Sequence, residues 1–370
     1  MTDSTRNLTT DGEPGALRRV LRVIFYPVML VVQCGLLAIF ILSFAPLLSD
    51  VVPVTAAFES FTVLLLCASA ALTLAGLLFR PRWLAVLGIA SLVWNLVQLW
   101  PYIPMHMIPG IGELAVADTG GADTVTNSSP KLKVVSANLW YRNDSYDAAL
   151  NYFASSHADV IGIVEITPQG VATLAPLIKD YPYRVDCMDR TPPCEIMLLS
   201  KYPFVKSFAG RIDGNSPTIT WGEIMFQGRA ITVAETHFAW PLLPAKSNAG
   251  ASAAGTLQSP PLLDSDPLVQ SQQGRNLAQY LSGLGPDLVL MGDFNSVPWS
   301  RTQSALRAAT GLDNRGPIVP TWPAWSPFWL RLPIDHIFVR GALQRVGFKS
   351  GYYVGSDHLP VEAEIALKPQ

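Results

Sequence analysis

Short polar side chains that could bind a cation and transfer a proton recur beside strand-like runs in the second half of this 370-residue sequence. The stretch MGDFNSVPW at 291–299 sets Asp293 and Asn295 two residues apart, directly after an apolar run. The stretches PIDHIFV at 333–339 and GSDHLPV at 355–361 each place a carboxylate beside a histidine, next to another such run. Functional side chains commonly lie where a rigid strand passes into a loop. The three stretches therefore predict one polar site at the edge of a sheet.

The polar residues at the predicted strand ends are carboxylates, amides and histidines, without a thiol. Oxygen donors of this kind suit Mg²⁺ or Mn²⁺ better than zinc. A histidine beside carboxylates can transfer a proton or stabilise charge on a phosphoryl oxygen. Hydrolysis of a phosphodiester by a metal ion, an oriented water and a histidine would use the whole set. Its members are Asn138, Glu165, His237, Asp293, Asn295, Asp335, Asp357 and His358.

Strand-like and helix-like segments are interspersed from residue 131 onward, and these elements must position the polar set. Mixed strands and helices over such a length indicate one α/β domain in which helices cover sheets. We expect strands at 132–138, 159–165, 196–200, 230–237, 287–293, 336–339 and 361–367, and helices at about 146–156, 270–282 and 301–309.

Six short motifs in this region resemble, in order, those of the endonuclease/exonuclease/phosphatase superfamily. This superfamily includes pancreatic-type deoxyribonucleases, abasic-site endonucleases, neutral sphingomyelinases and inositol polyphosphate phosphatases. The resemblance covers about Leu132–Leu367 and implies a four-layer α/β/β/α sandwich with the site at one edge of two packed sheets. The motifs are N-L-W at 138, V-E at 164, T-H-F at 236, G-D-F-N at 292, I-D-H at 334 and S-D-H-L-P-V at 356.

The resemblance also implies a role for the residues that would hold the metal and the attacking water. Glu165 would be the principal ligand of Mg²⁺, or of Mn²⁺ in its place, and Asp357 would complete the shell of metal or water. Asn138 would lie at the scissile phosphate. Asp293 would position or deprotonate the water, and Asn295 would hold that geometry.

Two histidines complete the set that the resemblance implies. Asp335 would orient His358 through a hydrogen bond, and His358 would contact the phosphate. His237 occupies the position at which abasic-site enzymes carry tyrosine, so the chain is similar there to the deoxyribonuclease and sphingomyelinase branch. Glu195 is a weaker candidate for orienting His237. Which histidine is the acid and which the base stays open.

Taken singly, these residues also have structural interpretations. An Asp and an Asn two residues apart are common in turns, and His336, next to Asp335, is expected to be structural. The set as a whole, in the order of the family, favours a site.

Three long apolar runs begin the sequence, at 23–45, 57–79 and 83–105. Each is long enough to cross a hydrocarbon core of about 30 Å, which takes about 20 apolar residues. A signal peptide has a single, shorter run. The runs therefore predict an all-α anchor of three transmembrane helices over 23–107. The segment 108–130 is rich in Gly, Thr, Asp and Ser and is expected to be a flexible linker.

Basic residues in short loops set the orientation of such an anchor. The tail 1–22 and the turn 80–82 carry Arg residues, whereas the loop 46–56 and the stretch 107–130 carry neither Lys nor Arg. We therefore expect a cytoplasmic N-terminus in the plasma or inner membrane. After an odd number of spans, the catalytic domain 131–370 would lie on the periplasmic or extracellular side.

Two cysteines in the loop DCMDRTPPCE are consistent with export. Cys187 and Cys194 lie close in sequence, with two prolines turning the chain between them. This spacing suits a local disulfide, which an exported domain permits. A zinc site would need two further ligands nearby, and the sequence offers none.

The sequence leaves more than one substrate class open. Residues 131–370 contain 20 Lys or Arg and 20 Asp or Glu, so the domain lacks the positive charge typical of proteins that bind nucleic acid. The stretch TWPAWSPFWL at 321–330 is rich in aromatic residues, which favour a membrane interface or pack under the sheet edge. The predicted function is Mg-dependent hydrolysis of a phosphodiester or phosphomonoester in nucleic acid, lipid or a small molecule. A non-catalytic binding protein of the same fold is the alternative. Membrane lipids around the spans are the other partner expected.

Overall fold

The computed structural model describes residues 14–49, 51–78, 82–102, 130–191, 193–241, 268–314 and 316–369. The described part forms two compact units, one of residues 1–46 and 61–98 and the other of residues 47–60 and 99–370. The predicted linker, apart from Pro130, lies outside the described residues, as do the first 13 residues of the predicted tail.

The first unit consists of α1 (Pro14–Phe44), α2 (Thr62–Leu78) and α3 (Leu84–Leu99). Three stretches, Phe25–Leu48, Val54–Leu78 and Leu84–Tyr102, are helical, long and apolar enough to cross a membrane. Helices that are apolar on all faces are typical of membrane spans. The unit therefore fits a membrane anchor, in agreement with the prediction.

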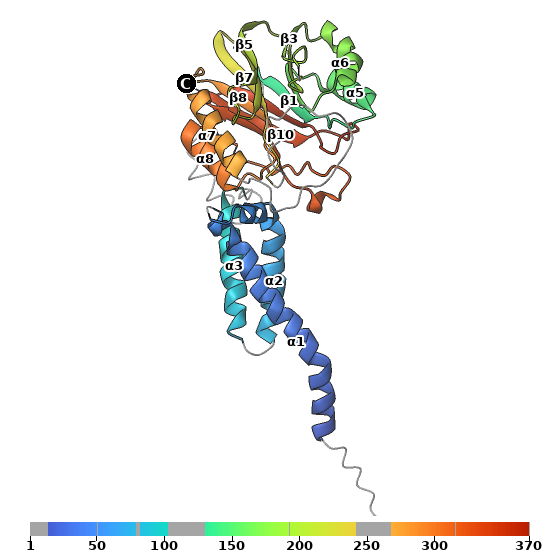
Figure 1. The fold of residues 1–370 in the computed structure, drawn as a ribbon, viewed down its shortest axis with the longest axis vertical. Helices are drawn as coiled ribbons and strands as arrows, with labels where there is room; N and C mark the ends of the chain where they lie inside the picture. The colour runs from blue at the N-terminus through green and yellow to red at the C-terminus, as the bar shows by residue number, and fades with distance from the viewer. Residues whose placement is uncertain are drawn as a thin grey trace, which may run out of the picture. The chain divides into compact units, whose positions relative to one another are not determined.

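The second unit contains two mixed sheets (Figure 1). The first sheet has the strand order β10-β11-β1-β2-β4-β3, and the second has the order β5-β6-β7-β8-β9. The strands of the first sheet are β1 (Leu132–Asn138), β2 (Val160–Val164), β3 (Tyr183–Asp186), β4 (Ile196–Ser200), β10 (Leu343–Ser350) and β11 (Val361–Leu367). Those of the second are β5 (Phe204–Arg211), β6 (Thr218–Phe226), β7 (Arg229–His237), β8 (Leu288–Asp293) and β9 (Asp335–Arg340).

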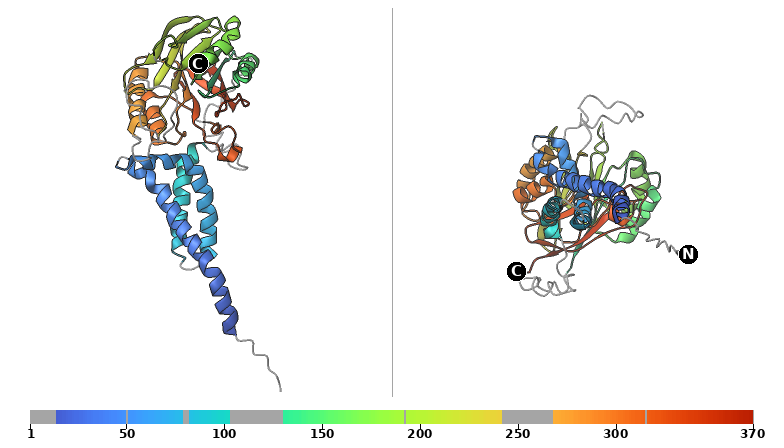
Figure 2. Two further views of the ribbon diagram at one scale, coloured as in Figure 1. Left: turned by 45° about the vertical axis from the view of Figure 1, so that its right-hand side comes forward. Right: turned by 90° about the horizontal axis from the view of Figure 1, so that it is seen from below.

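Helices cover the outer face of each sheet. The first sheet packs on α5 (Tyr146–Ser156) and α6 (Pro168–Leu174), and the second packs on α7 (Leu268–Ser282) and α8 (Arg301–Thr310). A third apolar core lies between the sheets, where residues of β1 and β11 meet residues of β7 and β8. The two helical layers lie on opposite sides of the sheets (Figures 1 and 2). This is the four-layer α/β/β/α sandwich that the family resemblance predicted.

Two parallel strand pairs bring the ends of four strands to one edge of the sandwich. In the first sheet, β1 and β2 are parallel, with Asn138 opposite Val164. In the second, β7 and β8 are parallel, with His237 opposite Asp293. Antiparallel β9 begins at the same edge, where Asp335 pairs with Asp293. The pairing of the strands thus gathers polar residues that are far apart in sequence.

Four strands were not among the predicted elements, namely β3, β5, β6 and β10. Three of them, β3, β5 and β10, lie at sheet edges, where exposed faces weaken the apolar pattern. The fourth, β6, pairs with β7 through the turn at Gln227 and Gly228, which both have positive φ. Glycine suits such a turn because it has no Cβ to clash.

The second unit, called the catalytic unit below after its predicted function, also includes residues that were predicted to belong to the anchor. We call residues 47–60 and 99–102 the collar; they contain most of η2 (Pro53–Phe61) and all of η3 (Trp100–Tyr102). The indole of Trp299 donates a hydrogen bond to the Glu59 carbonyl at 2.7 Å, and the Tyr102 hydroxyl donates one to the Pro298 carbonyl at 2.7 Å. The collar therefore packs directly on the segment that follows Asn295.

Candidate active site

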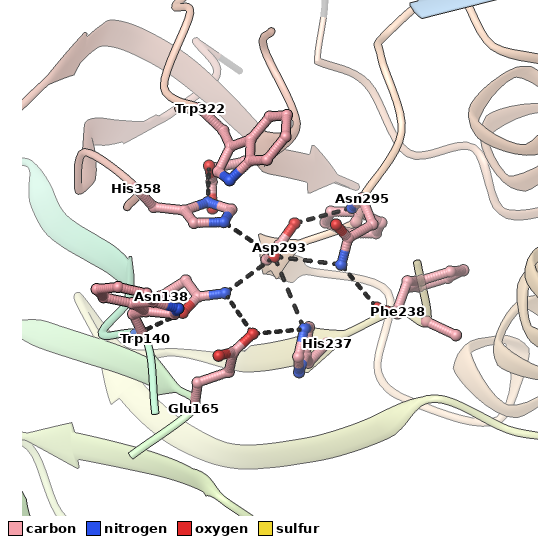
Figure 3. A network of polar contacts seen from close by, with 12 residues as sticks. Asn138, Trp140, Glu165, His237, Phe238, Asp293, Asn295, Trp322 and His358 are labelled. Carbon is pink, nitrogen blue, oxygen red and sulfur yellow. Dashed lines mark hydrogen bonds and ion pairs between the residues drawn. The ribbon is translucent and has the colours of Figure 1, made fainter. Parts of the chain in front are cut away.

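Asn138 links two carboxylates at the centre of the site (Figure 3). Its Nδ2 donates to Glu165 Oε1 and to Asp293 Oδ2, both at 3.0 Å. The backbone N–H of Trp140 donates to Asn138 Oδ1 at 2.8 Å and thereby fixes the orientation of the amide. The two sheets are joined at this point, because Asn138 ends β1 and Asp293 ends β8.

Glu165 directs its carboxylate into the open part of the site. It follows β2 with a φ of 55°, in the left-handed region that non-glycine residues seldom adopt. Such strain is found at functional positions more often than elsewhere. The backbone N–H of Tyr141 donates to Glu165 Oε2 at 3.3 Å, and the side chain stays partly exposed.

Asp293 and Asn295 form a turn whose polar atoms point inward. The backbone N–H of Asn295 donates to Asp293 Oδ1 at 2.8 Å. The Asn295 Nδ2 donates to the Phe238 carbonyl at 2.9 Å and to Asp293 Oδ2 at 3.3 Å. The turn is therefore tied to β7 as well as to its own strand. Asp293 and Asn295 therefore form a turn, as the structural interpretation predicted, and the same turn is part of the candidate site.

Both histidines of the predicted set face the same oxygen of Asp293. The Nε2 atoms of His237 and His358 each lie 3.7 Å from Asp293 Oδ2, and His237 Nε2 lies 3.5 Å from Glu165 Oε1. Burial raises the pKa of Asp293 to about 6; Asp335 adds to the rise, while His358 and His237 oppose it. A carboxylate with such a pKa can accept a proton near neutral pH.

His358 is held by a second carboxylate on its other side. His358 Nδ1 lies 2.9 Å from Asp335 Oδ2, and both side chains are buried. Burial by itself lowers the pKa of His358, but the carboxylates of Asp335 and Asp293 outweigh it and raise this pKa to about 10. The imidazole is therefore cationic at neutral pH, with Nε2 directed toward Asp293.

Asp357 lies beside this pair and contacts an aromatic residue. The Trp322 indole donates to Asp357 Oδ2 at 3.1 Å. Burial raises the pKa of Asp357, and the neighbouring charge of Glu165 adds to the rise, while His358 and the Trp322 hydrogen bond oppose it. The charge of Glu165 therefore disfavours ionisation of Asp357.

The donor set of the site fits a hard divalent cation. Glu165, His237 and Asp293 each offer an atom within 4.8 Å of the others, as do Asp293, Asp335 and His358. Asn295 Oδ1 and Asp357 Oδ1 are buried without a hydrogen-bond partner among the described residues. Oxygen atoms in this state are suited to bind water or a metal ion. Mg²⁺ or Mn²⁺ would therefore be held by residues already in place, with Glu165 as the most accessible carboxylate.

The structure brings all eight predicted site residues to one sheet edge, but two neighbouring residues are placed elsewhere. His336 is buried, its Nε2 lies 2.8 Å from the Ser296 carbonyl, and its ring packs against those of Phe294 and Phe338. The contacts of His237 within the described chain are to Glu165 and Asp293, and Glu195 is not among them.

Three supporting residues were missed as site residues by the sequence reasoning. Ser356 Oγ donates to the Asn138 carbonyl at 2.7 Å, Thr321 Oγ1 donates to Asp335, and Trp322 donates to Asp357. Ser356 stands in the SDH motif itself. Trp322 and Thr321 are far from their partners in sequence, so spacing along the chain gives no sign of them.

Cys187 and Cys194 are joined by a disulfide with Cα atoms 5.4 Å apart. Cys187 is buried and packs against Val164, the residue before Glu165. The disulfide loop therefore supports the strand end that carries this carboxylate.

Two packed sheets with carboxylates, amides and histidines at one edge define the class of this domain, a four-layer α/β sandwich with a candidate metal site. The model of the endonuclease/exonuclease/phosphatase family matches residues 135–358, and the chain belongs to this family. No curated protein matches the sequence of this chain.

Solved structures agree with this fold. The endonuclease/exonuclease/phosphatase from Bacteroides vulgatus is 14% identical with a TM-score of 0.51, over 65% of this chain and 100% of that one. A family protein from Bacteroides thetaiotaomicron is 15% identical with a TM-score of 0.50, over 65% of this chain and 99% of that one. Sphingomyelinase C from Streptomyces griseocarneus is 17% identical with a TM-score of 0.45, over 64% and 99%.

Proposed function

We propose that this protein is a membrane-anchored hydrolase of phosphodiesters that depends on a divalent cation, Mg²⁺ or Mn²⁺. The observation that carries the proposal is the position of Asp293 Oδ2. This oxygen accepts a hydrogen bond from Asn138 and lies 3.7 Å from both His237 and His358. A potential base, two imidazoles and an amide thus converge on one point, as hydrolysis by an activated water requires.

The side chains divide the chemistry among them. Asp293 accepts a proton from the attacking water, and Asn295 keeps its carboxylate oriented toward that water. His358, kept cationic by Asp335, stabilises negative charge on the phosphoryl oxygen. His237 or His358 returns a proton to the leaving oxygen as its bond to phosphorus breaks, and Asn138 contacts the phosphate.

A bound divalent cation would polarise the phosphoryl oxygen and lower the pKa of water. Glu165 would be its principal ligand, with Asp357 completing the shell. Glu165 follows β2, and Asp357 lies in the segment before β11. The unpaired Oδ1 of Asp357 and the group of Glu165, His237 and Asp293 support this assignment.

We further propose that the catalytic domain lies on the periplasmic or extracellular side, with the N-terminus in the cytoplasm. The distribution of Arg in the short loops supports this orientation. The Cys187–Cys194 disulfide suits an oxidising compartment as well.

Glu165→Gln is the substitution that tests the proposed chemistry most directly. It removes the charge that would hold the cation and preserves the size of the side chain. We expect the full-length protein in detergent to hydrolyse bis(p-nitrophenyl) phosphate with Mg²⁺, and the variant to lose roughly a hundredfold or more of this activity. EDTA should abolish the wild-type activity, and added Mg²⁺ should restore it.

The matched control is Glu223→Gln on β6, outside the site, which should retain wild-type activity. Thermal midpoints of both variants near that of the wild type would show that the fold is intact. If wild-type activity persists in chelator, the proposed metal dependence is wrong. If the wild type hydrolyses neither phosphodiesters nor phosphomonoesters with either cation, the alternative of a non-catalytic binding protein is favoured.

A further inference from the structure

An exposed aromatic loop, residues 321–332, lies between α8 and β9. Four large apolar side chains at its tip face solvent: Trp325, Phe328 and Trp329 are 65%, 68% and 68% exposed, and Leu330 is 48% exposed. Clustered exposure of this kind marks a binding surface far more often than scattered apolar residues do. The tip therefore does not pack under the sheet edge, which was one of the two interpretations of this stretch.

The loop has a defined conformation even though its tip is exposed. Trp322 and Leu332 form an antiparallel bridge at its base. The guanidinium of Arg331 donates to the carbonyls of Ser326 and Ala324, both at 2.8 Å, and η7 (Phe328–Leu330) forms one helical turn. The aromatic rings are thus presented on a scaffold that is built by hydrogen bonds rather than by burial.

The base of the loop is part of the candidate active site. The Trp322 indole donates to Asp357 Oδ2, and its ring centroid lies 6.5 Å from that of His358. The backbone N–H of Ala324 donates to the Asp357 carbonyl at 2.7 Å. The exposed tip therefore begins one residue beyond a backbone contact with the SDH motif, so whatever the tip binds is brought close to His358.

The two ends of the same loop lie beside the last residue of the third candidate span. One small cavity is lined by Tyr102 of the collar and by Val319 and Pro333, which flank the loop on either side. Tyr102 is the last residue of that span.

The collar itself adds apolar side chains at this end of the unit. Leu47 and Leu48, the last two residues of the first candidate span, and Val51, which follows it, are exposed. The chain passes between the two units at 46–47, 60–61 and 98–99, so the collar is the part of the second unit that adjoins the candidate spans in sequence. The cavity at Tyr102 lies at the base of the aromatic loop, so this base is next to the last residue of one of these spans.

We propose that the aromatic loop inserts into the interface of the bilayer that holds the anchor, and that the substrate is a lipid whose phosphodiester headgroup lies in this leaflet. This inference rests on the proposed function and names its substrate class. Tryptophan and phenylalanine favour the boundary between headgroups and acyl chains. Equal numbers of basic and acidic residues in 131–370 offer no net attraction to a nucleic acid.

The test compares a lipid substrate with a soluble one in the same full-length protein. Purified protein in nanodiscs of phosphatidylcholine, phosphatidylglycerol and sphingomyelin is assayed for release of phosphorylated headgroups, and separately for hydrolysis of bis(p-nitrophenyl) phosphate. The variants are Phe328→Ser with Trp329→Ser, the milder Trp329→Phe, and the control Tyr183→Ala on edge strand β3.

We expect lipid hydrolysis by the double variant to fall about tenfold or more. The reason is that two aromatic rings inserted into the membrane interface would raise the affinity of the protein for the bilayer more than about tenfold. Its hydrolysis of the soluble diester should remain within about twofold of wild type, because neither side chain touches the site. Lipid hydrolysis by Trp329→Phe should lie between that of the wild type and that of the double variant. Lipid hydrolysis by Tyr183→Ala should equal that of the wild type. Quenching by brominated lipid should also be weaker for Trp329→Phe than for wild type, because one indole has left the interface.

Each contrary result has a distinct meaning. Hydrolysis of the soluble diester without any lipid hydrolysis, or equal losses on both substrates in the double variant, would overturn the lipid inference and leave the proposed function standing. Faster hydrolysis of DNA or RNA than of every lipid would overturn it in favour of a nuclease. Inactivity on all of these substrates would instead count against the proposed function itself.

Discussion

Asp293 is the residue on which the candidate site depends, because one of its oxygens faces Asn138, His237 and His358 together. Its burial raises its pKa to about 6, near the pH at which it would have to accept a proton. The pKa of His358 is raised as well, because the carboxylate of Asp335 stabilises its protonated form, so His358 is an acid rather than a base. The surroundings thus give Asp293 and His358 different pKa values, so that one can serve as a base and the other as an acid. This arrangement is characteristic of catalytic sites.

Asp335 and His358 are predicted to act as one unit. His358→Ala should reduce phosphodiester hydrolysis by roughly a hundredfold or more, and Asp335→Asn should also reduce it, because the amide cannot hold the imidazole cationic. The double variant should be about as slow as His358→Ala alone, since groups that act together are not additive. Rates of the three variants on bis(p-nitrophenyl) phosphate check this.

Additive losses in the double variant would mean that the two residues act separately. His157→Asn is the control, because His157 ends α5 in a left-handed conformation that asparagine also tolerates. That variant should keep wild-type activity.

His336 should make stability depend on pH. Burial lowers its pKa from the ordinary 6.5 to about 4. The unfolded chain therefore binds the proton more readily between these values, so this contribution to stability is complete above pH 6.5 and is lost as the pH falls toward 4. From pH 7 to pH 5 the loss should be about 2 kcal/mol.

The measurement is the thermal midpoint of full-length wild type and of His336→Gln, in the same detergent at pH 7 and pH 5. The wild-type midpoint should fall further than that of the variant, which has no imidazole to protonate. An identical fall in both proteins would show that His336 does not contribute. Glutamine can keep a hydrogen bond to the Ser296 carbonyl, so it separates titration from the loss of this contact.

At the scale of the elements, the segment between β8 and α8 connects the site to the collar. All its residues from Ser296 to Ser300 are buried, which is unusual for a connecting loop. Gln270 of α7 donates to the carbonyls of Ala239 and Asn295, while Trp299 donates to the carbonyl of Glu59 in the collar. The turn that carries Asn295 is therefore held from two sides.

Trp299→Phe should reveal this support. The substitution removes the hydrogen bond to the Glu59 carbonyl and keeps an aromatic ring, which should cost about 0.5–1.5 kcal/mol of stability. The lost Trp299–Glu59 hydrogen bond should lower the thermal midpoint, and the resulting shift of the Asn295 turn should reduce hydrolysis several-fold. Assays of the full-length protein in detergent measure both.

Trp83→Phe provides the comparison, because Trp83 is exposed and lies outside the catalytic unit. It should change neither quantity. A Trp299→Phe protein with a lower midpoint but unchanged activity would show that the collar stabilises the fold without positioning the site.

At the scale of the whole molecule, the anchor and the catalytic unit are not joined simply by a linker. The collar belongs to the same compact unit as the sandwich, so a fragment that begins at residue 131 would lose the partners of Trp299 and Pro298. The full chain is consequently the form in which activity should be assayed.

The orientation of the chain is the prediction at this scale. Because Arg residues cluster in the tail and in the turn 80–82, a reporter fused after Gln370 should behave as exported. Alkaline phosphatase, which needs export for activity, should be active in this fusion, and a fluorescent protein that folds only in the cytoplasm should be dark. The reverse result would overturn the orientation and the compartment proposed for the disulfide.

The sequence alone was sufficient for the fold class and for three helices that fit a membrane anchor, whereas the roles of the site residues stay predictions. The apolar runs are long, and their physical meaning depends on length and composition rather than on distant contacts. The buried strands β2, β4 and β8 were recognisable because their sequences are almost continuously apolar. The family model and the solved structures confirm the fold that the order of the motifs implied.

Tertiary structure decided which residues touch, because hydrogen bonds join residues that are far apart in sequence. Three hydrogen bonds could not be predicted from the spacing of residues along the chain. They join Trp322 to Asp357, Trp299 to Glu59 of the collar, and Ser356 to Asn138. Edge strands β3, β5 and β10 escaped prediction because half their side chains face water. The exposure of the aromatic loop was likewise open in the sequence, since an aromatic residue is equally at home in a core or at an interface. Whether the aromatic loop is buried or exposed depends on how the rest of the chain packs around it.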